Sequence, residues 1–208
     1  MKGESNDRKR LARLLDEVAV DEGLHPTFID GVRVLRRSHS LPRAPIVYDP
    51  RIVIVGQGRK RAYLGDRVYD YDPFNYLVLS VPMPAECEAE ASPEEPILIV
   101  TVDVEPAMLG ELILEMDDSS PPPGTTPRGI SSTPMNDELV GAVVRLLECL
   151  KCSVDSRILG PQTVREIVYR VLLGEQGGSL RALASRDDHF ARIARVVKYL
   201  HAEYARPL

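Results

Sequence analysis

Three closely spaced arginines carry the clearest chemistry in the sequence. Arg33, Arg36 and Arg37 lie in the segment VRVLRR. On an extended chain Arg33 and Arg37 share one face, with backbone positions about 13 Å apart, whereas Arg36 points to the opposite face. A guanidinium group binds phosphate oxygens through two parallel hydrogen bonds and stacks on aromatic rings. The pair therefore has the chemistry to hold a ligand that carries several phosphates.

The spacing R-x-x-x-R resembles the arginine motif of PilZ-type cyclic di-GMP sensors, although the companion motif D/N-x-S-x-x-G does not appear cleanly. Solvated surface arginines are the alternative, because arginine is commonly exposed. Between residues 33 and 67 there are nine basic residues and two acidic ones, within a chain of net charge −5. We therefore predict an anionic effector, with cyclic di-GMP as the leading candidate. Its principal ligands are Arg33 and Arg37, and Arg36 contributes less.

The sequence shows no set of catalytic or metal-binding residues. None of its four histidines lies between residues 40 and 188, so strands in that region offer a metal no imidazole. Cys149 and Cys152 form a C-x-x-C without a second cysteine pair or a nearby histidine, and we expect them to be buried thiols. No nucleophile motif and no phosphate-binding glycine loop is recognisable. We predict that the protein is not an enzyme and has neither a metal nor a cofactor.

The region that positions the arginines reads as a series of short apolar strands. We expect them at about 31–38, 44–49, 52–56, 59–64, 67–71, 76–81, 85–91 and 96–103, separated by turn residues. Gly65 and Asp66 fit a two-residue hairpin turn whose first position needs a positive φ. Pairing outward from this turn sets Arg61 against Asp70, so opposite charges face each other.

Helices precede and follow these strands. Residues 7–20 place their leucines on one stripe, and residues 105–116 form a second helix that opens with a proline. Residues 117–136 contain five prolines among Ser, Thr and Gly, which predicts a mobile connector, with a ligand lid as the alternative. Helices follow at 137–150 and 161–173. The second has the most regular apolar stripe outside the strands, formed by Val164, Ile167, Val168, Val171 and Leu172.

The run YDPRIVIVGQGRKRAYLGDRVYDYDPFNYLVLSVPMPAECEAEASPEEP resembles the N-terminal domain of one branch of AraC-type transcriptional regulators. The elements GQGRKR, LGD, YDP, YLVLSVP and ASPEEP agree in order and spacing. The resemblance implies an α+β fold, in which a cupin-like antiparallel β-barrel that senses a small molecule is followed by helices. It also implies dimer contacts on those helices, so we predict a homodimer held chiefly by the stripe Val164, Ile167, Val168, Val171 and Leu172. Packing of part of this stripe on the barrel is the alternative.

The C-terminal segment FARIARVVKYLHAEYARPL resembles the first helix of the family's helix-turn-helix domain. The family would continue beyond Leu208 into its DNA-reading helices, so we expect a truncated chain without sequence-specific DNA affinity of its own. No apolar run reaches the length of a membrane helix, and the N-terminus lacks the apolar core of a signal peptide. These features predict a cytoplasmic protein with no membrane contact.

Five regions are expected from these patterns. They are an N-terminal helix or arm (1–22), a cupin-like β-barrel with a packed helix (23–116), a Pro/Ser-rich loop (117–136), dimerisation helices (137–186) and the start of a helix-turn-helix domain (187–208). The predicted function is effector binding and dimerisation in a DNA-binding transcriptional regulator. Two alternatives stay open: a metal-free cupin enzyme acting on a small molecule, and a pure dimerisation module whose barrel is filled by its own side chains.

Overall fold

A computed structural model describes residues 4–73, 75–116 and 129–185 of the chain. The helices in these ranges are α1 (Glu4–Val18), α2 (Pro106–Glu115), α3 (Asp137–Cys149), α4 (Ser153–Ile158), α5 (Gly160–Leu173) and α6 (Gly177–Ser185). The strands are β1 (Gly23–Pro26), β2 (Val32–Arg37), β3 (Leu41–Tyr48), β4 (Arg51–Gln57), β5 (Arg59–Leu64), β6 (Arg67–Tyr71), β7 (Asn75–Leu79), β8 (Met83–Glu90), β9 (Ile97–Asp103) and β10 (Ile130–Pro134).

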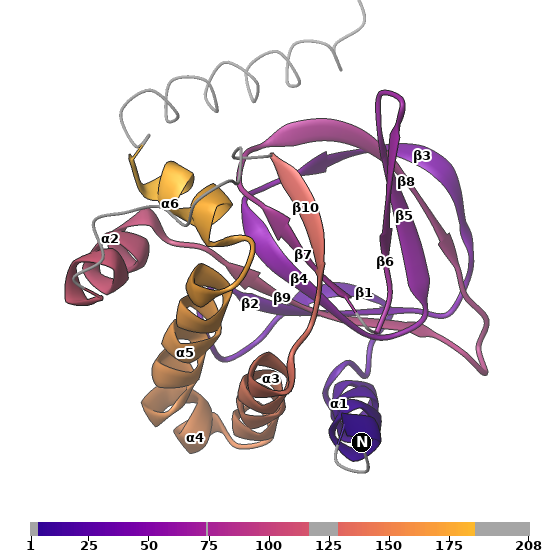
Figure 1. The fold of residues 1–208 in the computed structure, drawn as a ribbon. Coiled ribbons are helices and arrows are strands. Elements are labelled where there is room, and N and C mark those ends of the chain that lie inside the picture. Colours follow the sequence, from indigo (N-terminus) through magenta and orange to yellow (C-terminus); the bar gives the residue numbers. More distant parts are fainter. Residues whose placement is uncertain (1–3, 74, 117–128, 186–208) are drawn as a thin grey trace, which may run out of the picture.

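The strands form two antiparallel sheets that face each other. One has six strands in the order β1-β2-β9-β4-β7-β10, and the other has four in the order β3-β8-β5-β6. Helices α1, α3 and α5 lie on the outer side of the six-stranded sheet (Figure 1). The predicted α+β class is confirmed, with the expected barrel present as two separate facing sheets.

Alternation along the strands of the larger sheet creates two hydrophobic cores. In β9, Leu98, Val100 and Val102 point toward the helices, whereas Ile97 and Ile99 point toward the four-stranded sheet. The same alternation divides β4 and β7, as the two-residue period of a strand requires. We call the helix side the outer core and the space between the sheets the inner core.

Helix α1 lies directly against the outer face of the larger sheet. A Cβ atom at Gly56 in β4 would approach Leu15 Cδ1 to 2.5 Å and Leu11 Cδ2 to 2.6 Å, so this contact requires a glycine. Arg36 of β2 points to the same side, donating to the carbonyl oxygen of Ala19 at 2.6 Å and pairing with Asp16. The apolar stripe predicted for this helix is therefore buried on the sheet.

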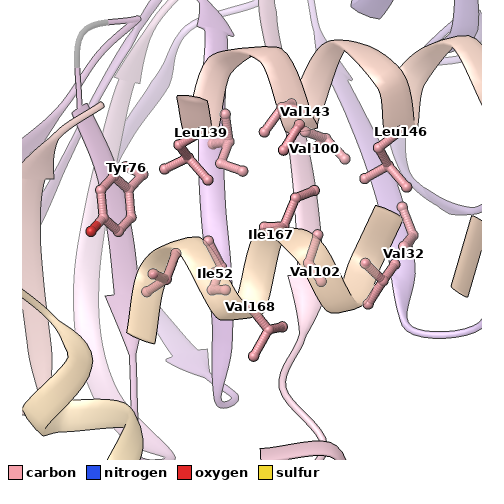
Figure 2. Packing of buried hydrophobic residues seen from close by; sticks show 14 of the residues in the cluster. Val32, Ile52, Tyr76, Val100, Val102, Leu139, Val143, Leu146, Ile167 and Val168 are labelled. Atoms are coloured by element: carbon pink, nitrogen blue, oxygen red, sulfur yellow. The ribbon is translucent and has the colours of Figure 1, made fainter. Parts of the chain in front are cut away.

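Helices α3 and α5 complete the outer core (Figure 2). Asn136 caps α3, its side-chain oxygen accepting from the amide of Leu139 at 2.9 Å. Facing them across the core, Ile52, Val100 and Val102 come from the sheet. The α5 stripe is buried here, with 0–6% of each side chain exposed, in Val164, Ile167, Val168, Val171 and Leu172.

This burial corrects the predicted dimer interface. The α5 stripe has the right period for a helix interface, but it packs against α3 and the sheet of the same chain. Side chains that are already covered within one protomer have no apolar surface left for a second copy. A homodimer has to use other residues.

The hairpin predicted around Gly65 is confirmed, including its register. Gly65 has φ +58°, and Leu64 pairs with Arg67 while Arg61 pairs with Asp70. The Arg61 and Asp70 side chains form an ion pair at 3.3 Å. All eight predicted strands are present, with ends shifted by a few residues.

Two further strands were missed, and one of them corrects the predicted loop. Residues 130–134 of the Pro/Ser-rich segment form β10, which pairs with β7 at the edge of the larger sheet. Residues 117–128 lie outside the described part of the chain. Helix α2 is present as predicted, but it lies beside α5 and α6 (Figure 1). Among the described residues no helix is long and apolar enough to span a membrane.

Candidate ligand-binding site between the two sheets

A pocket of about 520 Å³ lies between the sheets, in the inner core. Strands β1, β2, β4 and β9 contribute one wall, and β3, β5, β6 and β8 contribute the other. Its apolar lining consists of Leu24, Leu35, Leu41, Ile46, Val47, Val53 and Ile99. Its polar lining consists of Arg33, Arg37, Tyr48, Asp49, Arg51, Lys60, Tyr71, Cys87 and Thr101.

The three arginines of β2 lie on the faces expected from strand geometry. Arg33 and Arg37 both line the pocket, whereas Arg36 faces α1. Arg33 donates to Asp103 Oδ1 at 2.9 Å, and Arg51 lies 3.7 Å from the same oxygen. The charge of Arg33 is therefore compensated within the protein. Arg37 forms no ion pair with a described carboxylate and acts on the pKa of Glu22 only as a nearby charge, so it is the β2 arginine most available to a ligand.

The positive stretch between residues 33 and 67 is largely neutralised by the fold. Five of its nine cations form ion pairs with carboxylates: Arg33, Arg36, Arg43, Arg51 and Arg61. Within the described ranges, four have no carboxylate within 4.0 Å: Arg37, Arg59, Lys60 and Arg67. Of these four, only Arg37 and Lys60 line the pocket. The positive charge that an anionic ligand could meet in the pocket therefore comes from two side chains, Arg37 of the six-stranded sheet and Lys60 of the four-stranded sheet.

Lys60 is the most unusual of these cations. Its ammonium nitrogen lies 5.7 Å from the centre of the Tyr71 ring, within range of a cation–π contact. Burial lowers the pKa of this ammonium group, the neighbouring thiol of Cys87 raises it, and the positive charge of Arg37 lowers it again. A partly buried cation without a carboxylate partner is costly, and an anionic ligand would relieve that cost.

Hydroxyl groups add hydrogen-bonding capacity to the pocket. The hydroxyls of Tyr48 and Tyr71 lie 2.7 Å apart in a buried hydrogen bond. Burial raises the pKa of both phenols, so both stay protonated. The Oγ1 atom of Thr101 is buried and has no hydrogen-bond partner among the described residues. Arg51 Nε also lacks a hydrogen bond there, although it lies 3.7 Å from Asp103 Oδ1. A bound ligand could satisfy these groups.

The C-x-x-C pair lies far from the pocket lining and is split by burial. Cys149 is buried and burial raises its pKa, whereas Cys152 is exposed, which corrects the expectation of two buried thiols. The exposed cysteine lies beyond the end of α3, where its amide donates to the Cys149 carbonyl oxygen at 3.2 Å, and it is the N-cap residue of α4. Over residues 4–73, 75–116 and 129–185 no group of three His, Cys, Asp or Glu side chains is arranged to hold a metal.

Of the residues that line this pocket, the sequence singled out only Arg33 and Arg37 as candidate ligands. The period of β2 placed these two together, but Tyr48, Tyr71, Cys87 and Thr101 gave no local signal. Most of these side chains come from the four-stranded sheet and meet β2 only through the packing of the sheets. The one available hint was Lys60, which belongs to the GQGRKR segment and to the basic stretch.

Solved structures with a distant likeness include forms of ToxT from Vibrio cholerae. An apo variant from strain SCE256 has a TM-score of 0.47 at 7% identity, covering 73% of this chain and 58% of that one. ToxT from strain O395 gives 0.42 at 9% identity, covering 66% and 54%. The wild-type protein with a bound unsaturated fatty acid gives 0.42 at 7% identity, covering 67% and 51%. The chain thus spans less than two thirds of each.

Among curated proteins, none matches the sequence. A family model does: the one for the AraC-type transcriptional regulator N-terminus matches residues 28–179. The match covers most of the chain, from the loop before β2 to the start of α6, and so includes both sheets of the pocket. The chain therefore belongs to the family of AraC-type transcriptional regulator N-terminal domains, and it is a regulatory domain rather than an enzyme.

Proposed function

We propose that this domain senses a small anionic molecule with an apolar body, bound in the pocket between the sheets. The observation that carries the proposal is that Arg37 and Lys60 line one pocket and that no carboxylate of the described residues lies within 4.0 Å of either cation. Side chains that keep a protein folded are normally paired when they are charged and removed from water. Two unpaired cations in one cavity indicate that the missing counter-charge arrives with the ligand.

The rest of the lining fits such a molecule. The volume of about 520 Å³ lies in the range of small-molecule sites, which are mostly apolar with a few polar groups that set orientation. Leu35, Val53 and Ile99 provide an aliphatic wall from the larger sheet, and the Tyr48 and Tyr71 hydroxyls offer hydrogen bonds. An acid group would contact the cations while the body of the molecule contacts this wall.

Cyclic di-GMP is the second candidate effector. In its favour, Arg33 and Arg37 face the same pocket, as the R-x-x-x-R motif requires. Against it, Arg33 is already paired with Asp103 at 2.9 Å, so a clamp of two arginines would first have to break that ion pair. A ligand with one anionic group needs only Arg37 and Lys60. We therefore favour a small organic anion over cyclic di-GMP as the effector.

The pocket also bears on the pure dimerisation module. In that alternative the protein's own side chains fill the space between the sheets, whereas a pocket of about 520 Å³ is left there. We propose that effector binding is coupled to a homodimer and to DNA binding through the helix-turn-helix domain of the regulator. The homodimer contacts in this proposal lie outside the buried α5 stripe.

Titration calorimetry with a panel of organic acids, neutral analogues and cyclic di-GMP tests the proposal. We expect Arg37→Ala to weaken binding of the acids by about 1.5–3 kcal/mol, roughly ten- to hundredfold, because charge-assisted hydrogen bonds are lost. Arg59→Ala is the matched control: Arg59 is exposed, lacks a carboxylate partner and lies outside the pocket lining. Equal losses in both variants would mean diffuse electrostatic attraction. Binding of none of the panel would remove the proposal.

A further inference from the structure

The two unpaired cations of the pocket differ in the chemistry open to them. A guanidinium group stays protonated in proteins, whereas an amine that loses its proton becomes a nucleophile. We infer that the effector is an oxo acid, whose carboxylate binds Arg37 and whose carbonyl carbon forms a reversible imine with the Lys60 amine. This inference rests on the proposed function and specifies the ligand of the same site.

The surroundings of Lys60 distinguish it from an ordinary surface lysine. Its side chain lines the pocket, its nitrogen lies 5.7 Å from the centre of the Tyr71 ring, and no carboxylate within the described residues approaches it to 4.0 Å. Lys151 shows the contrast, because it lies at the surface with its Nζ 2.5 Å from Glu17 Oε2. A carboxylate partner stabilises the protonated amine, and Lys60 has none within 4.0 Å among the described residues.

The surroundings of Lys60 lower its pKa on balance, which raises the fraction of free amine. Burial is the largest effect and lowers its pKa, Cys87 opposes this, and Arg37 adds a further lowering. Tyr48 and Tyr71 are neutral phenols, because burial raises the pKa of both. The unpaired nitrogen and its pocket carry the argument, and these groups increase the fraction of amine available at neutral pH.

The condensation needs no partner that the pocket lacks. The lone pair of the Lys60 nitrogen attacks the carbonyl carbon, and one proton passes from the nitrogen to the former carbonyl oxygen, which gives a carbinolamine. The hydroxyl then takes up a proton from solvent and leaves as water while the nitrogen lone pair forms the C=N bond, and the protonated imine returns one proton to solvent. One water is released and no oxidant or reductant is consumed. Hydrolysis reverses the sequence, which suits a sensor that has to release its effector.

Arg37 selects among carbonyl compounds. Its guanidinium group can bind a carboxylate through two hydrogen bonds, and its charge does not depend on pH in the physiological range. Because Arg37 and Lys60 come from opposite sheets, a molecule held by both bridges the pocket from β2 to β5. A simple aldehyde would react with Lys60 without this anchor and would bind more weakly.

Reductive trapping of the purified protein tests the inference. The protein is incubated at neutral pH with α-ketoisocaproate and sodium cyanoborohydride, which converts an imine to a stable secondary amine, and the labelled lysine is located by peptide mass spectrometry. We expect Lys60 to be labelled about tenfold or more above Lys151, because Arg37 lines the same pocket and can hold the carboxylate of the oxo acid there, and about 1.4 kcal/mol of such binding already gives tenfold occupancy. Lys151 lies at the surface and pairs with Glu17. Isocaproate, which has the acid but no carbonyl, should bind without labelling.

Two variants separate the roles of the cations. In Lys60→Arg the positive charge is kept, so isocaproate binding should persist while labelling by α-ketoisocaproate disappears. In Arg37→Ala, labelling by α-ketoisocaproate should fall about tenfold, whereas labelling by isovaleraldehyde, which has no carboxylate, should be unchanged. Circular dichroism confirms that each variant is folded.

The outcomes distinguish the inference from the proposed function. If both acids bind but Lys60 is not labelled, the imine is wrong and the anion site stands. The inference also fails if Lys60→Arg still shows a covalent adduct, since Cys87, the thiol that lines the pocket, would then be the reacting group. If neither acid binds, both the imine and the anion site are wrong.

Discussion

The two faces of the six-stranded sheet are formed by the same strands but have different roles. Its outer face contacts α1, α3 and α5 through a core that is almost wholly aliphatic. Its inner face shares the space between the sheets with two buried tyrosines, an unpaired lysine and an unpaired arginine. One face is optimised for burial, which stabilises the domain, and the other accepts polar groups that cost stability.

Two neighbouring residues of β2 contact the two different faces of the sheet. Arg36 holds the end of α1 through the Ala19 carbonyl oxygen at 2.6 Å, and Arg37, one residue later, lines the pocket. The alternation of a strand places these two guanidinium groups on opposite sides of one sheet. Stability and ligand binding can therefore be tested separately by substitutions that differ only in the face they touch.

The largest expected effect is on the outer core. Val168→Asp combined with Val171→Asp places two carboxylates among buried apolar side chains, at a cost of several kcal/mol for each. We expect the double variant to lose its cooperative unfolding transition by circular dichroism. Leu173→Asp is the control on the same helix, because Leu173 is 56% exposed and its change should stay within about 0.5 kcal/mol. A folded monomer from the double variant would instead restore the α5 stripe as a dimer interface.

The contact between α1 and the sheet should tolerate no added methyl group. In Gly56→Ala the new Cβ would lie 2.5 Å from Leu15 Cδ1, so α1 has to shift, at a cost of about 1–3 kcal/mol. Gly110→Ala is the matched control, since nothing lies within 4 Å of a Cβ in the middle of α2, and it should stabilise by about 0.5–1 kcal/mol. Chemical denaturation measures both. An unchanged Gly56→Ala would mean that α1 is not held as described.

The inner core should depend on its polar groups being paired with each other. Tyr48→Phe leaves the buried Tyr71 hydroxyl without its 2.7 Å partner and should cost about 1–3 kcal/mol. The double variant Tyr48→Phe with Tyr71→Phe removes both hydroxyls and should be more stable than the single one. If the double variant is the less stable, the hydroxyls are satisfied by other groups.

The smallest effect should have the opposite sign. Lys60→Met removes a desolvated cation, and we expect it to raise the free energy of unfolding by about 0.5–2 kcal/mol while it weakens acid binding. The pKa of Lys60 is lowered in the folded state. Between this lowered pKa and the usual lysine pKa, the folded protein loses the Lys60 proton while the unfolded chain keeps it, so the stability of the wild type rises with pH in that window. The stability advantage of Lys60→Met over the wild type should therefore shrink as the pH increases. Thermal unfolding at several pH values checks this, and a destabilised variant would contradict it.

The sequence was informative wherever a pattern was local. The Gly65 hairpin was predicted to the register, because turn chemistry and charge pairing act over a few residues. The apolar stripe of α5 was correctly predicted to be buried. A period of 3.6 residues, however, does not show whether the stripe packs against its own chain or against a second copy. The site was half predicted for the same reason: Arg37 follows from strand alternation, whereas Lys60 joins it only through packing of the two sheets.

Composition misled the prediction at one place. Residues 130–134 read ISSTP within a Pro-rich segment, which favours a loop, yet they form β10. Pairing with β7 supplies the hydrogen bonds, and the proline lies at the last position of an edge strand, where a missing amide is tolerated. Such a strand is specified by its partner more than by its own residues.

The position of β10 has a consequence for how the protein is made. Its partner β7 is complete at Leu79, but the ribosome has to add 51 further residues before Ile130 emerges to pair with it. Until then β7 has an open edge, and the nascent sheet shows its outer aliphatic face, including Val78 and Val100, because α3 and α5 come later still. Exposed edges and apolar faces are where nascent chains associate wrongly. Synthesis of this domain should therefore depend on chaperone binding during that interval.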